Sequence, residues 1–161
     1  MTFATSITLP DLGLGAGYAL WGFRAAAIGD VERPVLQNGF EAAFGDYGLS
    51  ALGGLHSLAR ELGVSGGRQI KIACPGCAYA TADELSIVML LSAAQEEDEA
   101  LCVSHLYWLM CGRGEEAAHA AALGVATVFK AAGVTIRRPQ IEVRAASGNK
   151  TFMSFHPAGR A

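Results

Sequence analysis

The sequence predicts an all-α fold, in which five or six helices pack around a buried central helix at residues 81–95. Three observations predict it. Hydrophobic residues make up 52% of the 161-residue chain, apolar side chains recur at helical spacing, and residues 81–95 are apolar on nearly their whole circumference. A helix with one apolar stripe packs against a core, whereas a helix that is apolar all round lies inside it. A chain of this length forms one domain of ordinary size.

The N-terminal half of the chain predicts three amphipathic helices after an irregular start. Residues 1–17 contain Pro10 and three glycines, which favour irregular backbone. Helices are expected over 18–28, over a segment that begins at Pro34, and over about 47–62, because each carries apolar residues on one face. Proline fits the first turn of a helix, where its missing N–H loses no hydrogen bond.

A short strand and the central helix follow. Residues 69–73, Gln-Ile-Lys-Ile-Ala, alternate in the manner of a strand, and we expect them to pair with 140–143 in a small two-stranded patch. The sequence from Thr81 to Glu84 is a capping box, in which each of these two side chains accepts a hydrogen bond from the backbone N–H of the other. The central helix is therefore expected to begin here.

Two further helices complete the predicted domain. Four consecutive acids at 96–99 complement the positive end of the helix that follows them, which extends to about Met110. The last helix is expected over about 115–132. We therefore expect residues 18–144 to form a single helical domain and residues 145–161 to be a flexible tail.

The charge balance excludes a nucleic-acid-binding protein, because a net charge of -3 provides no basic field. The longest strongly apolar stretch, 87–94, is far short of the ~20 residues that span a bilayer, and the first residues lack the basic start of a secretory signal. We therefore expect a cytoplasmic protein with reduced cysteines and no membrane partner. Only 17% of the residues are charged, which favours self-association or another protein as the partner.

The loop Cys74-Pro-Gly-Cys77 is the most informative motif. A C-x2-C turn can offer two thiolates to one metal ion, and the proline and glycine between them suit a tight turn. A tetrahedral zinc site needs two more ligands. Cys102 and His105 stand three residues apart on a predicted helix and project from one face. One interpretation is therefore a structural zinc site made by these four residues.

Two other interpretations of the loop are open. A strand, a CxxC motif and a helix in this order are typical of thioredoxin-type sites, which would make the protein a thiol oxidoreductase using Cys74 and Cys77. The capping box at Thr81, however, places both thiols ahead of the helix, and no βαβ elements surround them. In the third interpretation both cysteines are structural and pack as small apolar side chains at a turn.

No complete catalytic motif is present. The glycine-rich residues 13–17 lack the preceding strand and the βαβ continuation of a dinucleotide fingerprint, and helix capping accounts for Asp83 and Glu84. The sequence therefore predicts a soluble helical interaction or regulatory protein without catalytic activity. We assign no catalytic residue, and no cofactor apart from the zinc ion of the alternative.

Overall fold

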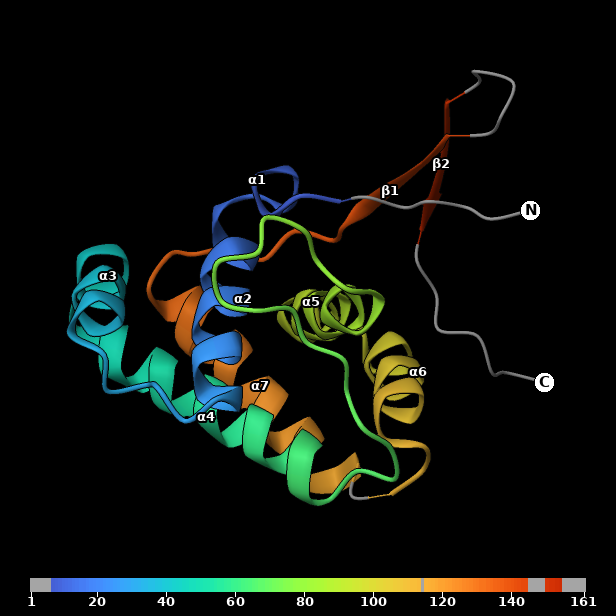
Figure 1. Ribbon diagram of the computed structural model, residues 1–161. Coiled ribbons are helices and arrows are strands. Elements are labelled where there is room, and N and C mark those ends of the chain that lie inside the picture. Colours follow the sequence, from blue (N-terminus) through green and yellow to red (C-terminus); the bar gives the residue numbers. More distant parts are fainter. Residues whose placement is uncertain (1–6, 114, 145–149, 155–161) are drawn as a thin grey trace.

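The computed structural model describes residues 7–113, 115–144 and 150–154. These residues confirm the predicted all-α class (Figure 1). The helical elements are α1 (Leu9–Leu12), α2 (Leu14–Ala27), α3 (Pro34–Phe44), the 3-10 turn η1 (Gly45–Tyr47), α4 (Gly48–Val64), α5 (Ala82–Gln95), α6 (Glu99–Met110) and α7 (Glu115–Ala131).

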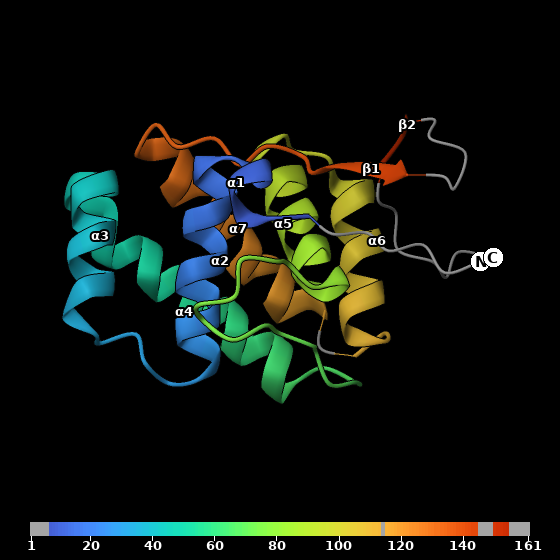
Figure 2. The same ribbon diagram turned by 45° about the horizontal axis from the view of Figure 1, so that its top comes forward.

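Helix α5 is the central helix, as predicted. Every residue from Asp83 to Ala94 is buried. Figure 2 shows α5 between α2 and α6, and α7 also packs against it. The predicted capping box is confirmed, because Thr81 Oγ1 accepts from the N–H of Glu84 at 3.0 Å and Glu84 Oε2 accepts from the N–H of Thr81 at 2.8 Å. The start of α5 is thus fixed locally.

The other half of the core lies between α2, α3, α4 and α7. Phe40 and Phe44 of α3 are buried there, and the ring of Phe44 meets that of Phe129 from α7 at a centroid distance of 4.6 Å. The apolar stripes predicted for α3, α4 and α7 supply buried side chains to this core, whereas on α2 the large buried apolar side chains are Leu20 and Phe23, and Ile28 just after it is 60% exposed. In the described part of the chain, no helix has the length and apolar character that crossing a bilayer requires.

The start of the described chain differs from the prediction for residues 1–17. A short helix α1 forms after Thr8, whose backbone N–H and side-chain hydroxyl both donate to Asp11, and α2 already begins at Leu14. Gly15 does not break this helix but lets it approach another segment closely. A Cβ atom there would lie 2.2 Å from the backbone oxygen of Thr135, so any larger residue would clash.

The predicted strand pairing is wrong. Residues 69–73 form no strand, and β1 (Gln140–Arg144) instead pairs antiparallel with β2 (Lys150–Ser154). β2 falls within the predicted flexible tail, 145–161, of which the remaining residues lie outside the described part of the chain. Residues 69–73 run past the start of α5, where side chains take the place of a partner strand.

Candidate functional site

The Cys74–Cys77 turn rests on a buried ion pair between two helices. Arg24 projects from α2, and Glu84 lies in the first turn of α5. Arg24 Nε lies 2.7 Å from Glu84 Oε1, and Arg24 Nη2 lies 3.0 Å from Glu84 Oε2. The exposed fractions of the two side chains are 1% and 0%. Removing either side chain would leave the other as an unpaired buried charge, which lowers the free energy of unfolding by about 3–5 kcal/mol.

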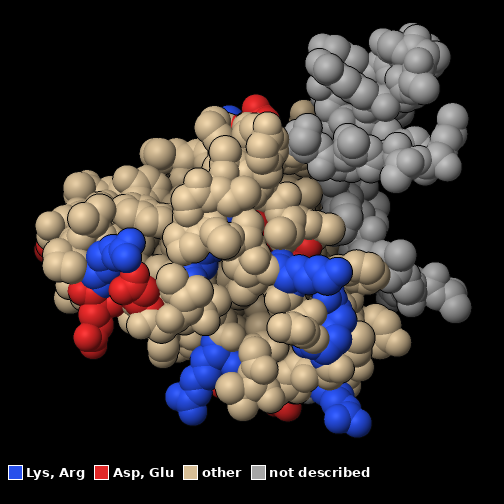
Figure 3. Space-filling view, in the orientation of Figure 1, with Lys and Arg blue, Asp and Glu red and all other residues tan. Residues whose placement is uncertain are grey.

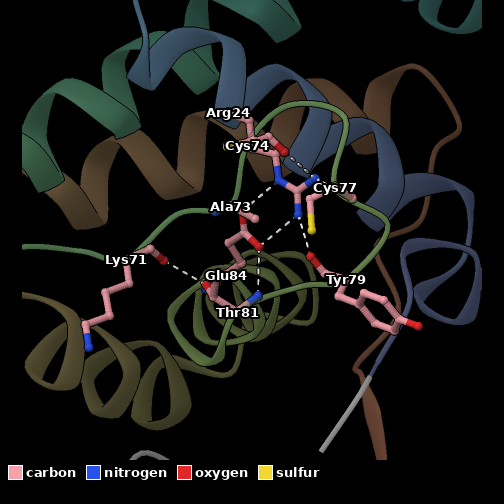
Figure 4. Close-up of polar contacts among 8 residues, drawn as sticks. All are labelled: Arg24, Lys71, Ala73, Cys74, Cys77, Tyr79, Thr81 and Glu84. Atoms are coloured by element: carbon pink, nitrogen blue, oxygen red, sulfur yellow. Dashed lines mark hydrogen bonds and ion pairs between the residues drawn. The ribbon is translucent and has the colours of Figure 1, made fainter.

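The rest of the Arg24 guanidinium is hydrogen-bonded to the backbone of the turn (Figure 4). Nη1 donates to the carbonyl oxygen of Cys77 at 2.8 Å and more weakly to that of Cys74 at 3.5 Å, while Nη2 donates to that of Tyr79 at 2.9 Å. A planar guanidinium presents its five N–H donors in a fixed geometry. Arg24 therefore fixes the positions of the three carbonyl groups relative to one another.

Side chains at the start of α5 form hydrogen bonds with the backbone of residues 71–73, as a neighbouring strand would. Asp83 Oδ2 accepts from the backbone N–H of Lys71 at 2.8 Å, and Glu84 Oε1 accepts from that of Ala73 at 3.1 Å. Thr81 Oγ1 donates to the carbonyl oxygen of Lys71 at 2.7 Å. The two acids thus do more than cap the helix, which was the role that the sequence suggested.

The turn itself is closed and held at its exit. The backbone N–H of Cys77 donates to the carbonyl oxygen of Cys74 at 2.9 Å. Residues 78–80 are bonded to residues 7–9 by two backbone hydrogen bonds of 2.8 and 3.0 Å. Both cysteines are free thiols, Cys74 exposed and Cys77 half-buried, and residues 72–80 include no charged side chain. The result is a loop with a fixed backbone and no charged residue, which carries one exposed and one half-buried thiol.

A second ion pair holds the beginning of the same loop. Arg68 donates to both carboxylate oxygens of Asp83, at 3.0 and 2.7 Å, and to the carbonyl oxygen of Trp108 at 2.9 Å. Burial raises the pKa of Asp83, but the hydrogen bonds from Arg68 and from the backbone N–H of Lys71 outweigh it, so this pKa lies below its ordinary value. The pair borders a pocket of about 620 Å³ that Cys111 also lines.

Cys102 and His105 face the core rather than a metal site. Both are buried in α6, and His105 Nδ1 lies 2.8 Å from the hydroxyl oxygen of Ser86 in a hydrogen bond between buried side chains. Burial, together with the charges of Asp98 and Glu99, raises the pKa of Cys102 to about 11. Cys102 is therefore a neutral thiol near pH 7.

The four residues of the predicted zinc site do not form one group. Cys74 and Cys77 lie in the loop, whereas Cys102 and His105 lie within the core. Among the residues that the structure describes, no three or more His, Cys, Asp or Glu side chains are placed to hold a metal ion. Zinc bound within one chain stays a prediction that this arrangement does not support.

Arg24 and Arg68 are the site residues that the sequence analysis missed. Arg24 lies on the same face of its helix as apolar side chains, and two acids begin a helix that is otherwise apolar all round. An arginine in an apolar stripe and a carboxylate at the start of a buried helix are each costly alone. Their coexistence in one chain is the signal that could have indicated a buried pair.

Comparison with protein-family models, with curated proteins and with solved structures found no match to this chain.

Proposed function

We propose that the protein is a non-catalytic interaction protein that self-associates through the Cys74–Cys77 turn. One observation carries the proposal: the buried Arg24–Glu84 pair uses its remaining hydrogen bonds to hold the backbone of an exposed turn. Apolar residues of similar volume often stabilise a fold as well as a buried ion pair does, so we infer that this pair is present because it selects one particular conformation of the turn. A turn of fixed shape suits recognition.

The surface around the turn supports this role. Figure 3 views the side on which the loop crosses α5: the middle of this face is mostly free of charged side chains, and Lys and Arg side chains lie to the right of it and below it. Tyr79, just beyond the turn, is 54% exposed, and exposed aromatic residues are enriched in protein interfaces. In a symmetric dimer the same surface of both copies forms the interface, so the turn of one copy lies against the turn of the other. Residues 72–80 carry no charge, so these residues can meet their copies without like-charge repulsion.

The proposal is tested by placing a charge at the tip of the turn without altering either thiol. A Cβ atom at Gly76 would have no neighbour within 4 Å, and the same holds for Gly53 on α4, so Gly76→Glu has a matched control in Gly53→Glu. We expect sedimentation equilibrium of the reduced, chelator-free chain to show a dimer. Gly76→Glu should weaken it by about tenfold or more, because like charges in an interface repel, and Gly53→Glu should leave it unchanged.

Two results would contradict self-association through the turn. One is a native chain that stays monomeric at every concentration tested, both with and without added zinc. The other is a dimer that both glutamate variants weaken equally, since that would place the interface elsewhere.

A second candidate function is thiol–disulfide exchange at the same turn. The observation that favours it is the unequal exposure of the two thiols, with Cys74 exposed and Cys77 half-buried. In this chemistry an exposed thiolate attacks first and the less exposed thiol then closes the disulfide, while glutathione disulfide is reduced to two thiols. Mass spectrometry after alkylation, with Cys111→Ser as background, should find a reversible Cys74–Cys77 disulfide. Its absence in glutathione buffers would exclude this candidate.

A further inference from the structure

We infer that one zinc ion, bound by Cys74 and Cys77 from each of two copies of this chain, joins the two copies. The inference rests on the proposed self-association and identifies the atoms that cause it. Structural zinc is almost always held by four cysteine or histidine ligands in a tetrahedron. The turn supplies two thiols, and the described part of the same chain groups no third ligand with them. The same turn of a second copy of the chain supplies the other two ligands.

The spacing of the two cysteines and the fixed backbone of the turn suit this arrangement. The C-x2-C spacing is the one with which a single turn gives two ligands to one zinc ion, at sulfur–zinc distances of ~2.3 Å. The hydrogen bond from Cys77 to Cys74 and those from Arg24 hold the loop before any metal binds. Holding a loop in its bound conformation lowers the entropy lost on binding. A two-fold axis through the zinc ion would make the two turns equivalent.

The charges around the turn are also compatible with the shared site. Four thiols lose their protons as the four sulfur–zinc bonds form, so metal binding releases protons and depends on pH. Four thiolates and one Zn²⁺ carry a net charge of -2, which nearby carboxylates would oppose. Residues 72–80 contain none, and the carboxylate of Glu84 beneath the loop is paired with Arg24.

The experiment is a zinc titration of the full, reduced chain after treatment with a chelator. Light scattering should show the mass doubling at one zinc per two chains. Cys74→Ser and Cys77→Ser should each prevent it, and Cys111→Ser, which removes another exposed thiol, should behave as the native chain does. Cobalt in place of zinc should produce thiolate-to-metal charge-transfer absorption only when both Cys74 and Cys77 are present.

Protection from alkylation gives a readout that needs no variant. Zinc should slow alkylation of Cys74 and Cys77 in the native chain and leave Cys111 unaffected. One zinc per monomer, or no zinc binding, overturns the shared site. A dimer that persists in chelator but is weakened by Gly76→Glu overturns the zinc bridge and leaves self-association standing, whereas a chain that is monomeric with and without zinc overturns both.

Discussion

Two arginine–carboxylate pairs meet at adjacent residues of α5, and they differ mainly in their exposure to water. Arg24 and Glu84 are 1% and 0% exposed, whereas Arg68 and Asp83 are 26% and 7% exposed. The inner pair holds the carbonyl groups of the Cys74–Cys77 turn, and the outer pair ties the start of the loop to α6. The same chemistry thus fixes two ends of one loop.

Burial decides how far such an ion pair constrains the backbone. If one member of the Arg68–Asp83 pair is removed, water can hydrogen-bond to the other, because the side chain of Arg68 reaches the surface. No water can easily replace the Arg24 guanidinium beneath the turn. We therefore expect the inner pair to determine the shape of the turn and the outer pair only to reinforce it.

The largest expected effect comes from Arg24→Met, which leaves the Glu84 charge buried and unpaired. The free energy of unfolding, measured by urea denaturation, should fall by about 3–5 kcal/mol. The double variant Arg24→Met/Glu84→Met should recover part of this loss, because it removes both charges together. A loss below about 1 kcal/mol, a value typical of surface pairs, would contradict the importance of burial.

Arg68→Met should have a smaller effect, of about 1–3 kcal/mol, the range for hydrogen bonds to charged groups. Water can approach Asp83 once the guanidinium is removed. Denaturation under the conditions used for Arg24→Met gives the direct comparison. Equal losses in the two variants would show that exposure does not distinguish the pairs.

Acid should weaken the outer pair, with an effect no larger than that of Arg68→Met. The pKa of Asp83 is lowered in the fold, so the unfolded chain binds this proton more readily. The resulting stability is fully present above the unfolded pKa of about 3.9 and is lost as the pH falls through the folded pKa. The difference in unfolding free energy between the native chain and Arg68→Met should therefore narrow in acid. A difference that stays constant down to about pH 2 would exclude this linkage.

The smallest effect is expected at Arg138, an arginine that is paired but 41% exposed. It contacts Glu96 and Asp98, which both lie in the short connection between α5 and α6. Surface pairs contribute about 0–1 kcal/mol, and salt screens them. Arg138→Met should thus change stability by less than about 1 kcal/mol, and less still in high salt. A loss of more than about 1 kcal/mol in the free energy of unfolding would show that an exposed pair can stabilise the fold as strongly as a buried one.

The parts of the fold that depend on local sequence were predictable. The capping box from Thr81 to Glu84 and the apolar run after it determine α5 without reference to distant residues. The strand at 69–73 was predicted wrongly because alternation shows only that the backbone is extended. It does not show that Lys71 and Ala73 donate to carboxylates of a helix rather than to another strand.

The site was predicted only where its residues are adjacent in sequence. The Cys74–Cys77 turn could be recognised from its spacing, but Arg24 lies 60 residues before Glu84, and no local pattern indicates that pairing. Helical spacing correctly placed Cys102 and His105 on one face of α6. It could not tell that this face is directed into the core, where Ser86 meets His105.

The long sequence separation of the Arg24 contacts has a consequence for the order of folding. Arg24 lies 50 to 55 residues from the carbonyl groups that it binds at Cys74, Cys77 and Tyr79. Contacts this distant close large loops and form after local ones. The loop can reach its final shape only once α2 has docked beside α5. The rate at which the half-buried Cys77 loses its unfolded-chain reactivity toward a thiol reagent during refolding should therefore report the docking of α2 beside α5.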